Sequence, residues 1–151
     1  MMDALDRLVS WQAIYDLSCD YMRAQDRLDP ALHIAVFHDD ATTDYGAGWQ
    51  GDAPGFVDFA QRVLTPHKAN HHMIGQVRID FESADMAFGE VYFQAHHRIV
   101  AEGGERVFRP KQRAAAMGAN AAHALRRAWA RTNSSMPANA LGSTVKRSSR
   151  S

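Results

Sequence analysis

Apolar and polar positions in the first part of the chain alternate with helical spacing. Between residues 5 and 21 the apolar side chains recur mostly every third or fourth position, namely Leu5, Leu8, Ile14, Leu17 and Tyr21. Charged side chains lie largely between them, which is typical of an amphipathic helix. Asp3, just before this stretch, is the expected N-cap.

Two more helices are predicted downstream. Asp29-Pro30 ends the first helix and begins a short second one that reaches about Asp39, because Pro is favoured in a first helical turn with Asp just before it. Residues 54–64 again carry their apolar side chains on one side, and Pro66 ends this third helix.

The pattern then changes to that of strands. A short strand is predicted from Thr42 to Tyr45, and two longer ones over residues 72–81 and 88–100, which are rich in Val, Ile, Phe and Tyr. Ser83-Ala84-Asp85 fits a hairpin connection between the long strands. Helices followed by antiparallel strands indicate an α+β domain, in which a curved sheet wraps against the helices and leaves a cavity.

Charge divides the 151 residues into two parts. Residues 1–108 hold eight basic and all 17 acidic groups, a net charge of −9, whereas residues 109–151 hold nine basic groups and no acid. We therefore interpret 1–108 as the folded domain and 109–151 as a basic tail, with an Ala-rich helix over 114–131 and a disordered end. We do not expect the tail to bind nucleic acid, because Ser-rich, aromatic-poor termini are usually only solvated.

Compartment and membrane association follow from smaller signals. The lone Cys19 excludes a disulfide framework, and Asp3 and Asp6 lie where a signal peptide carries basic residues. No apolar run approaches the roughly 20 residues that span a bilayer. A cytoplasmic protein without membrane association is expected.

Histidine is the residue type that most needs an explanation. Five of the eight lie in a short part of the chain, at His67, His71, His72, His96 and His97. In each adjacent pair one side chain faces in and one out, so a pair cannot bind one metal from a single strand face, and no metal or other cofactor is expected. Asp26, after the first helix, is the carboxylate that could orient one of these imidazoles as a base, although such an Asp is more often an exposed helix-end residue.

Several short motifs together resemble a known family. They are Leu5-Asp6-Arg7-Leu8, Ile14-Tyr15-Asp16-Leu17, Asp26, Phe37-His38-Asp39-Asp40-Ala41, Asp44-Tyr45, His72-Met73-Ile74-Gly75 and the strand from Gly89 to His97. In this order they are similar to the SnoaL-like branch of the NTF2-like superfamily, in particular its scytalone dehydratases and hexachlorocyclohexane dehydrochlorinases. The resemblance covers about residues 3–108.

The resemblance implies a fold and a function. The fold is a cone-shaped α+β barrel of the NTF2-like (cystatin-like) type, with a curved mixed sheet and helices that close a pocket. The function is that of a cofactor-independent lyase that eliminates water or HCl from a small hydrophobic cyclic substrate, in a homo-oligomer (dimer or trimer). A ketosteroid-isomerase-like enzyme and a non-catalytic binding module of the same fold are the alternatives.

The resemblance also assigns roles to residues. His72 takes the proton, Asp26 orients the imidazole, Tyr45 stabilises the enolate oxygen, and His97 lies beside the leaving group. Strand alternation adds three pocket residues on the face of His97, and two further apolar residues complete the expected substrate-binding set of Val91, Phe93, Ala95, Leu64 and Trp49.

Two departures from the family pattern stand out. Gln25 replaces a tyrosine, so a second carbonyl-orienting hydroxyl is expected to be missing. After Phe108 the strand motifs of the family are not recognisable. The tail is then either an accidental replacement, such as an out-of-frame reading, or a functional substitute that covers the pocket.

Overall fold

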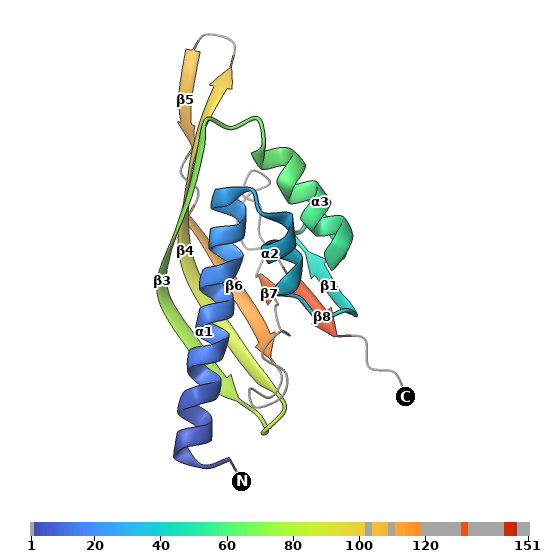
Figure 1. Ribbon diagram of the computed structural model, residues 1–151, viewed down its shortest axis with the longest axis vertical. Coiled ribbons are helices and arrows are strands. Elements are labelled where there is room, and N and C mark those ends of the chain that lie inside the picture. The colour runs from blue at the N-terminus through green and yellow to red at the C-terminus, as the bar shows by residue number, and fades with distance from the viewer. Residues whose placement is uncertain (1, 102–103, 109–110, 119–130, 133–143, 148–151) are drawn as a thin grey trace.

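The computed structural model describes residues 2–101, 104–108, 111–118, 131–132 and 144–147. It combines three helices with eight strands in this described part of the chain, which confirms the α+β class (Figure 1). In chain order the elements are α1 (Ala4–Arg27), α2 (Pro30–Ala35), β1 (Ala41–Asp44), β2 (Gln50–Asp52), α3 (Ala53–Leu64), β3 (Ala69–Phe81), β4 (Ala87–Ala101), β5 (Gly104–Phe108), β6 (Lys111–Gly118), β7 (Arg131–Thr132) and β8 (Thr144–Arg147).

Capping side chains set the helix starts that the sequence predicts, whereas α2 ends at Ala35 and not near Asp39. The Asp6 backbone N–H donates to Asp3 Oδ1 at 2.8 Å, at the start of α1. Leu28, in the left-handed conformation at φ 54°, ends α1. Asp29 then caps α2 by accepting from the Leu32 backbone N–H at 2.9 Å. Because the residue that ends α1 is followed directly by the residue that caps α2, the last turn of α1 has a fixed direction relative to α2.

The strands form two sheets. The larger has the order β3-β4-β6-β7, with β5 also paired to β4, and the smaller has the order β2-β1-β8. The resemblance implies a mixed sheet, but every strand pair in the described part of the chain is antiparallel. In Figure 1, α1 runs along the large sheet, whereas α2, α3 and the small sheet gather to one side of it.

A β-bulge interrupts β3. Ile74 pairs with Phe93 and Val77 pairs with Val91, so two residues of β3 lie opposite one residue of β4. A bulge of this kind reverses the in-and-out alternation of the strand beyond it. Without the bulge, His72 would lie on the opposite face from Val77; with it, both face the interior.

The basic tail differs from the expectation at its start. Residues 111–118 form β6, which pairs with β4 from Ala87 to Gln94, so the helix expected from residue 114 is wrong there. Ala-rich composition favoured the helix, but the open edge of β4 offers backbone partners that propensity does not include. Residues 119–130 lie outside the described part of the chain, and 144–147 form β8 rather than the expected disordered end. The domain boundary near Phe108 itself stays a prediction.

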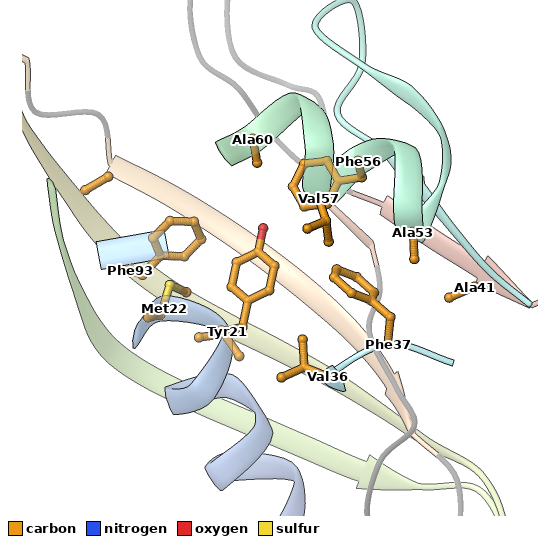
Figure 2. Close-up of a cluster of buried hydrophobic side chains, with 12 residues drawn as sticks. Tyr21, Met22, Val36, Phe37, Ala41, Ala53, Phe56, Val57, Ala60 and Phe93 are labelled. Carbon is orange, nitrogen blue, oxygen red and sulfur yellow. The ribbon is translucent and has the colours of Figure 1, made fainter. Parts of the chain in front are cut away.

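The main core lies between α1, α3 and the large sheet. Its buried side chains include five that fill the centre, Tyr21, Val36, Phe37, Phe56 and Phe93. Figure 2 shows Tyr21 in the middle of this cluster, with its hydroxyl directed toward the residues of α3. None of the helices described is both long and apolar enough to cross a membrane.

Candidate active site

Asp26 and His72 are joined by two hydrogen bonds. The imidazole Nδ1 of His72 lies 2.7 Å from Asp26 Oδ1, and the backbone N–H of His72 donates to Asp26 Oδ2 at 3.1 Å. A carboxylate only accepts, so the ring contact places the imidazole proton on Nδ1 and leaves Nε2 as the basic nitrogen. The His72 side chain is 4% exposed and that of Asp26 19%. The contact expected from the sequence is therefore present.

Two elements position this pair. Asp26 belongs to the last turn of α1, just before the helix ends at Leu28, and α1 packs against β3. His72 lies on β3 directly opposite Ala95 of β4, upstream of the bulge. Its neighbour His71 is exposed, as strand alternation requires. The helix end and the strand face together aim the carboxylate at the imidazole.

A cavity lies in front of this pair. It contains about 490 Å³ of empty space, including its open mouth, and is lined by Tyr21, Gln25, Tyr45, Phe56, Phe59, Ala60, Val63, Leu64, His72, Phe93 and His97. Aromatic and aliphatic side chains with a few polar groups fit a compact, mostly apolar ligand.

Two tyrosine hydroxyls meet at the cavity. The hydroxyl of Tyr45, after β1, is hydrogen-bonded to that of Tyr21 on α1, and the Tyr45 ring stacks on Phe56 with centroids 4.2 Å apart. Burial raises the pKa of Tyr21, so its hydroxyl stays neutral and can donate. The expectation that Gln25 leaves the site without a second hydroxyl is wrong, because Tyr21, one helical turn earlier, supplies it.

His97 also lines the cavity, beside His72. Their ring centroids are 5.2 Å apart in an edge-to-face arrangement. The Nδ1 of His97 lies 2.8 Å from Asn70 Oδ1, which is also 2.7 Å from His67 Nδ1. Burial, followed by the charges that His72 and His67 can carry, lowers the pKa of His97 to about 4. At neutral pH His97 is an uncharged imidazole.

A further histidine is fully buried behind the cavity. His33 of α2 packs edge-on against Tyr21 and Phe56, and its Nδ1 lies 3.3 Å from Gln61 Nε2. Burial, and to a lesser degree His72, lowers the pKa of His33 to about 4. This histidine belongs to the wall that supports Tyr21.

The apolar residues expected in the pocket divide into two groups. Leu64 and Phe93 line the cavity. Val91 and Ala95 face the interior on the same side of β4, but belong to the core cluster and are not among the described residues that line it. Trp49 stacks on Phe59 and donates from Nε1 to Thr43 Oγ1 at 2.8 Å, so it supports the lining from behind.

Several polar or aromatic residues of this region could not be singled out from the sequence, among them Phe59, which also lines the cavity. Tyr21 and Phe56 were assigned only to apolar helix faces, and Asn70 and His67 carried no motif. Tyr21 lies four residues before Gln25 and so shares its face of α1, and this spacing could have indicated Tyr21. Asn70 lies two residues before His72 on the same strand face, which is a weaker signal. Among the described residues, no group of three or more His, Cys, Asp or Glu is placed to hold a metal ion.

Comparison with known proteins defines the family. The model of the SnoaL-like domain matches residues 6–127. Two curated proteins of Sphingobium indicum, gamma-hexachlorocyclohexane dehydrochlorinase and hexachlorocyclohexane dehydrochlorinase 2, are each 36% identical over 91 residues. These alignments cover 58% of this chain and 58% of each relative, so the match spans less than two thirds of those proteins.

Solved structures agree on the fold. A hexachlorocyclohexane dehydrochlorinase of type 2 is 26% identical, with a TM-score of 0.63 over 76% of this chain and 78% of that one. A type 3 dehydrochlorinase from Novosphingobium barchaimii is 22% identical, with a TM-score of 0.65 over 93% and 97%. A structure named as a candidate scytalone dehydratase, from Novosphingobium aromaticivorans, is 18% identical, with a TM-score of 0.68 over 93% and 96%.

The fold is that of the NTF2-like proteins. Within that class, the chain belongs to the SnoaL-like domain family.

Proposed function

We propose that this protein is a cofactor-independent lyase that eliminates water or HCl from a small hydrophobic cyclic substrate. The observation that carries the proposal is the two-point hold of Asp26 on His72, which leaves Nε2 of a cavity-lining imidazole as a base. Relatives named as dehydrochlorinases support the same reaction class.

The first step is proton abstraction. His72 Nε2 takes a proton from the substrate carbon, and Asp26 stabilises the imidazolium that forms. Because Asp26 also accepts the backbone N–H of His72, the imidazole and its carboxylate keep their relative position while charge develops. A base fixed in this way supplies acceleration that a freely rotating imidazole in water does not.

The electrons of the C–H bond then form the double bond as the leaving group departs. In substrates with a carbonyl beside the acidic carbon, negative charge develops on that oxygen, and the hydroxyls of Tyr45 and Tyr21 are the donors proposed to stabilise it. In this proposal His97 lies beside the leaving group, and Leu64 and Phe93, which line the cavity, contact the substrate ring. Val91, Ala95 and Trp49 shape the wall from behind.

The test is a substrate screen of the purified protein against hydroxylated cyclic ketones and chlorinated cyclohexanes, with release of water-loss product or chloride as the readout. An isomerase would instead move a double bond without losing a group, and a binding module would give saturable binding without turnover. Either result would replace the lyase proposal. The homo-oligomer, dimer or trimer, stays a prediction that the mass of the purified protein in solution can test.

A further inference from the structure

Asn70 connects two histidines at the edge of the cavity. It lies on β3 directly opposite His97 of β4. Its side-chain oxygen is 2.7 Å from His67 Nδ1 and 2.8 Å from His97 Nδ1, and its side-chain nitrogen donates to the Leu64 carbonyl oxygen at 3.2 Å. The amide thus has a partner at each end.

These contacts fix the direction of the amide. Turning it by 180° would place Oδ1 against the Leu64 carbonyl, so two acceptors would face each other without a proton. With the oxygen toward the imidazoles, each Nδ1 must donate, because an amide oxygen only accepts. The two lone pairs of Oδ1 match the two donors.

We propose that Asn70 is a positioning residue of this site: its side-chain oxygen holds His97 in the tautomer that carries its proton on Nδ1, so that Nε2 is the nitrogen without a proton. The catalytic consequence rests on the lyase function proposed above. The tautomer itself does not depend on that function.

The surroundings of His97 keep this tautomer neutral. The titratable groups that face it are His67 from the loop before β3, His72 from β3, Asp26 from α1 and His96 on its own strand. Burial, His72 and His67 oppose a second proton on His97 more strongly than Asp26 favours it. A neutral His97 adds no like charge that would oppose proton uptake by His72, 5.2 Å away between ring centroids.

With His97 neutral, His72 is the residue that both takes the proton from carbon and returns it to the leaving group in a dehydration. His72 Nε2 removes the proton from carbon, the C–H electrons form the double bond, and the C–O bond breaks with its electrons on oxygen. The departing hydroxide takes the proton back from the His72 imidazolium and leaves as water, so the residues end in the state in which they began. His97 serves as a hydrogen-bond acceptor near this group and does not act as the acid.

The tautomer is measured by two-dimensional ¹H–¹⁵N NMR of the full chain with ¹⁵N-labelled histidine. Near pH 7 we expect His97 to carry its proton on Nδ1. Asn70→Asp keeps an acceptor and adds negative charge, so the titration midpoint of His97 rises by about one pH unit or more. Asn70→Ala removes the acceptor, so the tautomer with the proton on Nε2 becomes populated. His71→Gln, at an exposed neighbouring position, is the control and leaves His97 unchanged.

A wild-type His97 with its proton on Nε2, or an Asn70→Ala protein with an unchanged Nδ1–H signal, overturns the proposal. If Asn70→Ala does not fold, the wild-type tautomer and the Asn70→Asp titration decide. With a substrate in hand, Asn70→Ala lowers kcat about tenfold with a smaller change in KM, because a tautomer held in place acts after binding. Asn70→Asp regains kcat at pH values above the new midpoint of His97. A wild-type protein without turnover contradicts the lyase function and leaves the tautomer result standing.

Discussion

Asp26 holds His72 through both carboxylate oxygens, one on the imidazole Nδ1 and one on the backbone N–H of the same residue. The backbone contact fixes the strand relative to the end of α1, and the ring contact fixes the tautomer. The same carboxylate therefore contributes to the structure of the site and to its proposed chemistry. Substitutions of Asp26 can separate the two contributions.

Asp26→Asn should lower kcat by about 10³-fold, because an amide can present its NH₂ group to the ring and favour the tautomer with the wrong basic nitrogen. The fold should persist, since the amide oxygen can still accept one hydrogen bond. Steady-state kinetics and a thermal melt measure the two effects. Asp16→Asn, an exposed change on the same helix, is the matched control and should retain full activity. Equal kinetics for the two variants would contradict a role for Asp26 in orienting the base.

Tyr45→Phe should lower kcat by about 10²-fold on a substrate with a carbonyl, because one donor to the developing oxyanion is lost. Tyr21→Phe should have a similar or smaller effect, since its hydroxyl contacts that of Tyr45. Tyr15→Phe removes a hydroxyl from the same helix at a position next to Cys19 and serves as the control. If chlorinated cyclohexanes without a carbonyl are turned over, they should be affected much less. A uniform loss on both substrate types would contradict an oxyanion role.

Much of this arrangement can be predicted from the sequence, because capping residues and Pro mark where the helices begin and end. Asp3 and Asp29 are recognisable caps, and Asp29-Pro30 locates the end of α1 and therefore Asp26. The face of β4 that carries Phe93 and His97 also follows from alternation alone. His72 is a different case, because alternation by itself places it on the opposite face from Val77.

The bulge in β3 resolves that conflict and could not be derived from periodicity. Gly75 was the one sequence signal of the bulge, because a Gly inside a strand often marks a bulge or a close backbone approach. In the structure, a Cβ at this position would meet the Tyr92 carbonyl oxygen at 3.3 Å. The start of the tail fails for another physical reason. Residues 111–118 have helical composition, but the open edge of β4 decides their structure, and such a tertiary partner is not visible in local propensity.

Stability should fall in acid because His33 is buried without charge. Its pKa is lowered from 6.5 to about 4 in the folded protein, so the unfolded chain binds the extra proton first. The contribution of uncharged His33 to the free energy of unfolding is fully present above about pH 6.5. It is lost as the pH falls toward 4, by about 3 kcal/mol in all. Urea unfolding from pH 7 to pH 4 measures this slope.

His33→Phe should flatten that slope, since a phenyl ring suits the aromatic surroundings of His33 and does not titrate. A smaller slope should remain, because the pKa of His97 is lowered in the same direction. His71→Gln, at an exposed position, should keep the wild-type slope. An unchanged slope in His33→Phe would show that other groups govern the acid sensitivity.

Truncation after Phe108 should destabilise the protein. It removes β6 and leaves the edge of β4 from Ala87 to Gln94 without backbone partners. Exposed strand edges promote aggregation, and we expect Tm to fall by about 5 °C or more. Thermal melts of the full and truncated chains, with light scattering, make the comparison. Equal Tm values would favour the reading of residues 109–151 as an accidental replacement.

The proposed role of His72 as the base of an elimination reaction can be tested directly. The experiment compares the wild-type protein with His72→Gln and His71→Gln on hydroxylated cyclic ketones and chlorinated cyclohexanes, with the released product or chloride as the readout. We expect turnover by the wild type and by His71→Gln, whose side chain is exposed, and a loss of about 10³-fold or more in His72→Gln with the fold retained. Equal losses in the two variants, or turnover by His72→Gln at the wild-type rate, would contradict it.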